Sequence, residues 1–99
     1  MNGAQMISVQ IEHPIKDFES WRAAFDSDPV GRKQAGVRRY RVRRPVDDAN
    51  RVIIDLEFDN ITEAEAFLAA MRKVWDRVEG TLITGPKARI LETVEAKEL

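Results

Sequence analysis

The chain has no cysteine and only one histidine among its 99 residues. The lack of cysteine excludes disulfides, thiolate nucleophiles and thiolate metal sites. A histidine-based metal site would need carboxylates or a second chain, so we expect no metal site. No run of about eighteen apolar residues occurs, and residues 1–5 lack the basic and apolar stretches of a secretory signal. The sequence therefore predicts a cytoplasmic protein with no membrane partner.

An excess of charge of either sign is also missing. The chain has 16 Lys and Arg against 17 Asp and Glu, a formal net charge of −1. This balance argues against a general nucleic-acid binder. Hydrophobic residues make up 43% of the chain, which is enough apolar material for a core. The length fits one domain over residues 1–99, and we expect an ordered core over about residues 6–95.

Four segments alternate apolar and polar residues with the period of two that is typical of a half-buried strand. They are residues 6–12, 37–44, 51–58 and 87–94. Pro14 has no amide hydrogen and is expected to end the first strand before it. Residues 45–50 are turn-forming in composition and short, so the second and third strands are predicted to form a hairpin.

Two further segments change to a helical period. In residues 15–27, Phe18, Trp21 and Phe25 recur at helical spacing, and an Asp-Pro pair at residues 28–29 is expected to end this helix. Asp17 carries a negative charge that favours its N-terminus.

The second predicted helix follows a capping-box pattern. Thr62 and Glu65 have the spacing of the N-cap and its reciprocal partner, and Ile61 could pack back as a hydrophobic staple. A long apolar stripe continues through Trp75, and Gly80 is expected to end the helix.

The element order β-α-β-β-α-β predicts a ferredoxin-like α+β sandwich, with two helices on one face of a four-stranded antiparallel sheet. The alternation gives the sheet an apolar face for the helices. Its residues are Ile7, Val9, Ile11, Tyr40, Val42, Val52, Ile54, Leu56, Phe58 and Ile90. The same alternation places another set on the outer face: Arg39, Arg41, Arg43, Ile53, Asp55, Glu57 and Leu91.

This outer face mixes charged and apolar side chains, and two interpretations stay open. It is a solvated face, as in many antiparallel sheets, or a homodimer interface with ion pairs at its centre. A consistent register can place Arg39 or Arg41 opposite Asp55. A basic cluster could protect an exposed edge strand from aggregation, pair with carboxylates across a dimer or capture an anionic ligand. Its members are Arg32, Lys33, Arg38, Arg39, Arg41, Arg43, Arg44 and Arg51. RNA-recognition modules of this element order stack bases on aromatic residues here, but these positions carry none, so no nucleic-acid partner is expected.

His13 is the candidate catalytic acid or base. It occupies the next odd-numbered position after Ile7, Val9 and Ile11, so its side chain should point to the same face of the sheet. It should therefore lie at the rim between the sheet and the helices. Its side chain is the only one here with an unperturbed pKa near neutrality. The alternative is a strand-end histidine bonded to the backbone before a proline.

Large side chains on the helix-facing side are the candidate ligand-binding residues. Trp21, Phe25, Met71 and Trp75 could line an apolar pocket between helices and sheet, or they could simply pack the core. Tyr40 is expected as a buried phenol that needs a partner and could hold a ligand oxygen. The sequence contains no phosphate-binding glycine loop, nucleophile elbow or zinc-helix motif, and we expect no cofactor.

The segments HPIKDFESWRAAFDSDP, GVRRYRVRRPVDD and EAEAFLAAMRKVW resemble short bacterial proteins of no established activity, some labelled cyclases. Together with the element order, they make the chain resemble the dimeric α/β-barrel superfamily, which includes antibiotic-biosynthesis monooxygenases, polyketide cyclases and haem-degrading enzymes. The haem-degrading branch has an asparagine on the first strand and a histidine near the second-helix tryptophan. Here the first strand has no asparagine, and no histidine follows Trp75.

The resemblance implies a homodimer whose two sheets pair, and it leaves two functional hypotheses. In the first, the protein binds a small apolar or aromatic organic molecule and runs cofactor-free chemistry of the cyclase or monooxygenase type, with His13 and Tyr40 as catalytic residues. In the second, it is a non-catalytic homodimeric module. Free volume between the helices and the sheet distinguishes them, because an open cavity near His13 favours the first.

Overall fold

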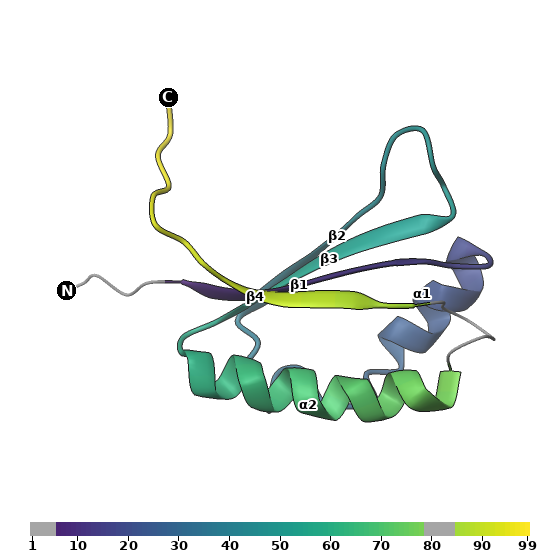
Figure 1. The fold of residues 1–99 in the computed structure, drawn as a ribbon, viewed down its shortest axis with the longest axis horizontal. Coiled ribbons are helices and arrows are strands. Elements are labelled where there is room, and N and C mark those ends of the chain that lie inside the picture. The colour runs from purple at the N-terminus through teal and green to yellow at the C-terminus, as the bar shows by residue number, and fades with distance from the viewer. Residues whose placement is uncertain (1–5, 79–84) are drawn as a thin grey trace.

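A computed structural model describes residues 6–78 and 85–99. Its elements follow in the order β1 (Ile7–Pro14), α1 (Phe18–Asp26), β2 (Arg39–Arg43), β3 (Arg51–Phe58), α2 (Ile61–Val78) and β4 (Lys87–Glu92). The strands form one antiparallel sheet in the order β2-β3-β1-β4. Both helices lie on the same side of this sheet (Figure 1). The predicted ferredoxin-like sandwich is confirmed.

The two faces of the sheet separate as the alternation predicts. On β3, Ile54 is 3% exposed and Leu56 is 1% exposed, because both lie under the helices. They pair across the sheet with Ile11 and Val9 of β1. The register places Arg41 opposite Asp55, one of the two predicted alignments. The period of two therefore identifies which residues form the core.

The core lies between the sheet and the two helices, with most of its helical residues on α2 and Trp21 on α1. Helix α2 buries Ala64, Phe67, Leu68 and Trp75 against the strands. The rings of Phe58 and Phe67 meet with their centroids 5.4 Å apart. Among the described residues, no helix is long and apolar enough to cross a lipid bilayer.

Strand β1 continues two residues past its predicted end. Pro14 pairs with Arg51 of β3, whereas the pairing with β4 stops at Glu12. At Pro14 the strand therefore has a neighbour on one side only, and the missing amide hydrogen costs no sheet hydrogen bond.

Helix α1 begins three residues later than predicted. The amide of Ile15 donates to the carbonyl of Asn50 at 2.8 Å, which keeps this residue beside the sheet. Asp17 is the N-cap, and its side chain accepts from the amide of Ser20 at 2.9 Å. This places the acidic residue at the helix N-terminus, as the sequence predicts.

The predicted N-cap of α2 is wrong. Asn60 caps the helix in place of Thr62, because its Oδ1 accepts from the amide of Glu63 at 2.8 Å and its Nδ2 donates to the Glu63 carboxylate at 3.3 Å. Ile61 is 51% exposed and forms no hydrophobic staple. Gly80, the predicted terminator, lies outside the described residues.

The second and fourth strands are shorter than predicted. Strand β2 starts at Arg39, and Val37 is buried in the core before it. Strand β4 ends at Glu92, and Val94 beyond it is 86% exposed.

Candidate functional site

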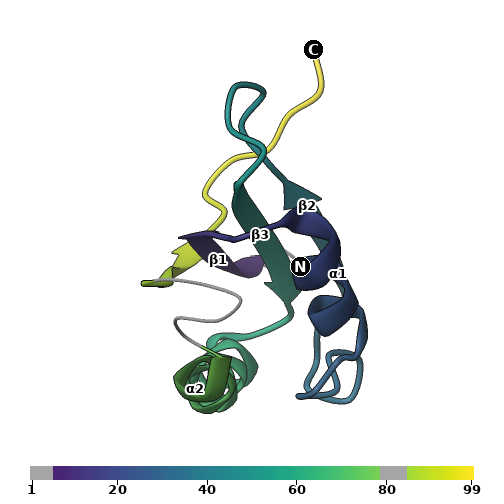
Figure 2. The same ribbon diagram turned by 90° about the vertical axis from the view of Figure 1, so that its right-hand side faces the viewer.

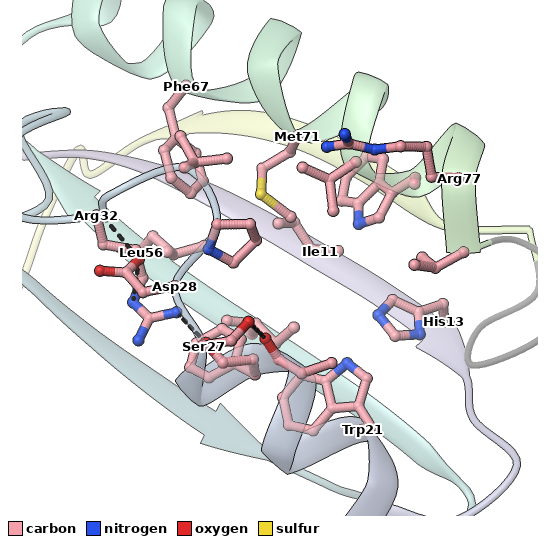
Figure 3. A pocket seen from close by; sticks show the side chains of 18 residues that line it. Ile11, His13, Trp21, Ser27, Asp28, Arg32, Leu56, Phe67, Met71 and Arg77 are labelled. Carbon is pink, nitrogen blue, oxygen red and sulfur yellow. Dashed lines mark hydrogen bonds and ion pairs between the residues drawn. The ribbon is translucent and has the colours of Figure 1, made fainter.

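A cavity of about 290 Å³ lies between the helices and the sheet. Four strand residues form its floor: Ile11, His13, Ile54 and Leu56. The walls come from α1, the segment after it and α2 (Figure 3). The volume is near the lower end of the range for small-molecule sites.

The placement of the two helices explains why this space is open. Helix α2 packs against β1, β3 and β4. Helix α1 lies toward the other edge of the sheet, where Phe25 contacts Tyr40 of β2 edge-on with ring centroids 5.2 Å apart. The two helices are well separated beneath the sheet (Figure 2). The middle strands are therefore covered from two sides, with the cavity between.

All four predicted ligand-binding residues lie on the cavity walls. Trp21 and Phe25 come from α1, and Met71 and Trp75 come from α2. The rings of Trp21 and Phe25 stack at 5.0 Å between centroids, with 22° between their planes. The walls are thus largely aromatic and aliphatic, a surface that suits a flat apolar molecule.

His13 is the polar group of the floor and is only 1% exposed. Its Nδ1 lies 3.1 Å from the carbonyl oxygen of Pro14. A carbonyl can only accept, so Nδ1 carries the proton of the neutral ring and Nε2 is left as a hydrogen-bond acceptor. Within residues 6–78 and 85–99, no side chain or backbone group hydrogen-bonds to Nε2. The predicted backbone bond is therefore present, and it leaves the second nitrogen available to a ligand.

The surroundings of His13 favour the neutral imidazole. Burial lowers its pKa, because the imidazolium ion loses hydration. The Pro14 carbonyl acts in the opposite direction by stabilising the charged ring, and the positive charge of Arg51 lowers the pKa further. The net direction is down from the ordinary value of 6.5, so the ring is neutral and able to accept a proton at neutral pH.

The lowered pKa of His13 predicts that acid destabilises the fold. The unfolded chain binds a proton at His13 more readily than the folded chain, so stability rises with pH in this window. The contribution of His13 to the free energy of unfolding should be complete above pH 6.5, should decrease as the pH falls from 6.5 toward the lower folded-state pKa, and should level off below that pKa. Denaturant titrations of the wild type and of His13→Gln would check this. Equal pH dependence for the two proteins would contradict it.

Tyr40 corrects the prediction of a buried phenol. It lies on the helix side of the sheet, but it is 44% exposed and is not among the residues that line the cavity. The cause is that β2 is an edge strand, and the contact of its Tyr40 ring with Phe25 of α1 leaves part of the ring uncovered. Tyr40 therefore does not face a molecule bound in the cavity.

The segment after α1 supplies a second polar group, for which the sequence indicated only that Arg32 belongs to a basic cluster. Asp28 has a left-handed backbone with φ of 55°, and its Oδ1 accepts from the amide of Arg32 at 2.8 Å. The Arg32 side chain donates through Nη1 to the carbonyl of Phe25 at 2.7 Å. Asp28 and Arg32 both line the cavity. An aspartate and an arginine four residues apart are common after the end of a helix, so this spacing alone could not have identified the site.

The outer face of the sheet carries a network of ion pairs. Arg43 pairs with Asp55, and Arg39 Nε lies 2.8 Å from Glu57 Oε1. Asp55, only 9% exposed, also accepts from Gln10 Nε2 at 3.2 Å. The carboxylates on this face are thus closely paired within one chain.

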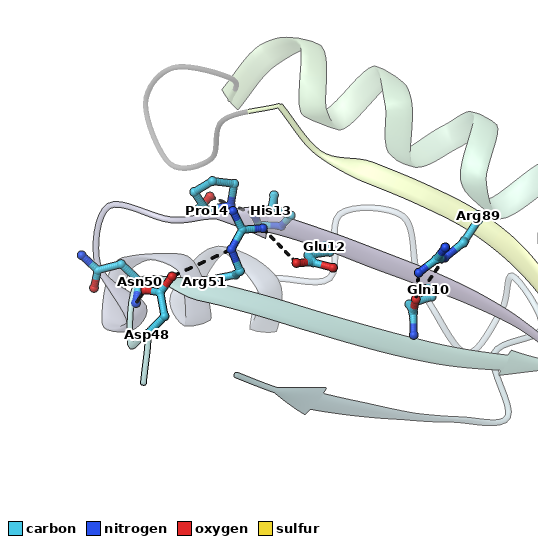
Figure 4. A network of polar contacts seen from close by, with 8 residues as sticks. All are labelled: Gln10, Glu12, His13, Pro14, Asp48, Asn50, Arg51 and Arg89. Carbon is cyan, nitrogen blue, oxygen red and sulfur yellow. Dashed lines mark hydrogen bonds and ion pairs between the residues drawn. The ribbon is translucent and has the colours of Figure 1, made fainter. Parts of the chain in front are cut away.

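The network extends along β1. Arg89 of β4 donates to Gln10 at 3.0 Å, and Arg51 lies 2.9 Å from Glu12 (Figure 4). Across the described part of the chain, no group of three or more histidine, aspartate or glutamate side chains is placed to hold a metal ion.

Comparison with known proteins supports the fold. No protein-family model matches the chain, and no curated protein matches it significantly. A crystal structure of a protein of unknown function from Nitrosomonas europaea matches with a TM-score of 0.75 and 13% identity, over 99% of this chain and 98% of its own. A candidate antibiotic biosynthesis monooxygenase from the same organism matches with a TM-score of 0.63 and 15% identity, over 95% of each chain.

A third solved structure is described as a dimeric ferredoxin-like protein from an uncultured marine organism. It matches with a TM-score of 0.61 and 16% identity, over 96% of this chain and 99% of its own. At these identities the likeness concerns the fold. The resemblance inferred from the sequence is confirmed at that level.

Proposed function

We propose that the protein binds a small, largely apolar or aromatic organic molecule in the cavity between α1, α2 and the sheet. The observation that carries this proposal is the open cavity of about 290 Å³, with aromatic walls and one histidine in its floor. A fully packed interior would have favoured a purely structural module. Apolar enclosure with a few placed polar groups is the usual form of a small-molecule site.

His13 is the group that would do chemistry on the bound molecule. Its neutral ring and free Nε2 suit the transfer of a proton from an acidic C–H or O–H group. The surrounding walls would exclude water and fix the orientation of the substrate. This is cofactor-free chemistry of the cyclase or monooxygenase type. The monooxygenase type fits the description of one matched structure from Nitrosomonas europaea as a candidate antibiotic biosynthesis monooxygenase.

We also propose that two copies assemble through the outer face of the sheet. One matched structure is described as dimeric. On this chain, the face combines ion-paired carboxylates with Ile53 and with Leu91, which is 37% exposed. Arg39, Arg41 and Arg43 would border the interface.

A neutral aromatic probe should bind to the cavity. We expect 2-naphthamide to bind with a Kd between about 10 µM and 1 mM, as its size and apolar character allow. Trp21 and Trp75 line the cavity, so their fluorescence should change as it fills. Calorimetry would give the affinity, and native mass spectrometry of fresh protein should show a retained small molecule. No binding of 2-naphthamide up to its solubility would contradict the proposal.

A further inference from the structure

The cavity has a polar group at each end. His13 lies at one end, and the guanidinium of Arg32 lies at the other, beside Asp28 (Figure 3). Apolar side chains from α1, α2 and the strands separate them. A molecule that spans the cavity would therefore meet the partly buried guanidinium of Arg32 at one end. At the other end it would meet the proton acceptor His13, on the side where Figure 3 also shows the exposed Arg77.

The charge of Arg32 is only partly compensated by the protein. Its side chain is 15% exposed, and its carboxylate contact within the described residues runs from Nε to Asp28 Oδ1 at 3.7 Å, too long for a hydrogen bond. That carboxylate oxygen already accepts from the backbone amide of Arg32. Among the residues that the structure describes, the guanidinium makes one hydrogen bond, to the uncharged carbonyl of Phe25. Within the described ranges, Nη2 donates to no group.

Aromatic rings supply part of the missing compensation. The guanidinium lies 4.0 Å from the centroid of the Phe25 ring and 4.9 Å from that of Tyr40. Such contacts hold the group in place, but they do not satisfy its remaining N–H donors. A partly buried guanidinium whose donors are free and face an apolar cavity favours a hydrogen-bonded anion.

We propose that the ligand is an apolar carboxylic acid, aromatic or aliphatic, whose carboxylate binds Arg32 while its far end reaches His13. This inference rests on the proposed function of the cavity. A carboxylate matches the planar fork of one guanidinium. The nearby charge of Asp28 disfavours anions of higher charge, such as phosphate esters. The proton transferred by His13 would then belong to the end of the molecule opposite its acid group.

A matched pair of probes tests the proposal. We compare 2-naphthoate with 2-naphthamide at about pH 7.5, where the acid is ionised and the shapes are nearly equal. The wild type should bind the carboxylate about tenfold more tightly or better. In Arg32→Gln this preference should fall to within about twofold, because the ratio of the two affinities measures the contact of the carboxylate with the guanidinium.

Two further variants make the test specific. Arg77 is the other cation on the cavity wall and lies on the last turn of α2, so Arg77→Gln should keep the preference for 2-naphthoate. Arg32→Lys keeps the charge without the fork and should retain a reduced preference, which covers the case in which Arg32→Gln folds poorly.

The outcomes separate the two proposals. If neither probe binds to the wild type, both the proposed function and this inference are overturned. If both probes bind equally well, or if the preference survives in Arg32→Gln, this inference is overturned and the proposed function stands. If the preference is lost in Arg77→Gln and kept in Arg32→Gln, the carboxylate binds near Arg77 rather than near Arg32. That result would also overturn the inference.

Discussion

Replacing Ala24 by phenylalanine should weaken the binding of 2-naphthamide by on the order of a hundredfold, because the new ring occupies the space that the ligand needs. Ala24 is on α1, between Trp21 and Phe25 in sequence, and lines the cavity with both of them. The added side chain enters open volume, so it should cost less than the 1–3 kcal/mol typical of overpacking. Calorimetry and thermal melting of the same preparations would measure both effects.

The neighbouring residue provides a matched control. Ala23 is exposed on the outside of the same helix, so Ala23→Phe has the same effect on helix propensity without filling the cavity. Its affinity for 2-naphthamide should stay within about twofold of the wild type. Equal losses in the two variants, or full binding by Ala24→Phe, would show that the ligand binds elsewhere.

The sheet faces and the cavity walls could be predicted because both depend on local periodicity. A strand turns alternate side chains to opposite faces, so Ile54 and Asp55 had to separate once residues 51–58 formed a strand. The spacing of Trp21 and Phe25 placed both on one face of a helix in the same way. These two patterns were therefore enough to predict which strand residues are buried in the cavity floor and which helix residues form the cavity walls.

The start of α2 could not be chosen from the sequence alone. Asn60 and Thr62 are both good capping residues, and each has a glutamate three positions later. The structure selects Asn60, whose carbonyl also accepts from the amide of Ala64 at 3.3 Å. Which residue caps the helix depends on the direction in which the chain leaves β3. The local sequence pattern carries no information about that direction.

The exposure of Tyr40 and the role of Arg32 were beyond the sequence for a related reason. Both depend on the distance between α1 and the edge of the sheet, a tertiary quantity. The alternation placed Tyr40 on the helix side of the sheet, but its contact with Phe25 of α1 leaves the ring 44% exposed. Arg32 reaches the cavity because the segment after α1 turns back at Asp28, whose backbone is left-handed.

The outer face gives the largest expected effect on assembly. Asp55 is 9% exposed and is paired with Arg43, and Glu57 is paired with Arg39. If a second copy covers this face, loss of the arginines leaves carboxylates buried without partners, and each such loss typically costs about 2–5 kcal/mol. The triple change of Arg39, Arg41 and Arg43 to alanine should therefore raise the dimer Kd by about a hundredfold or more.

Light scattering at micromolar concentration tests both the dimer and the role of these arginines. The wild type should have twice the chain mass of 11.3 kDa, and the triple variant should approach the mass of one chain. A control with alanine at Arg22, Arg72 and Lys73 removes the same charge from exposed helix positions and should remain dimeric. A wild type of single-chain mass would exclude the dimer. A triple variant of unchanged mass would exclude the arginines from the interface, because a covered face cannot lose both ion pairs without weakening.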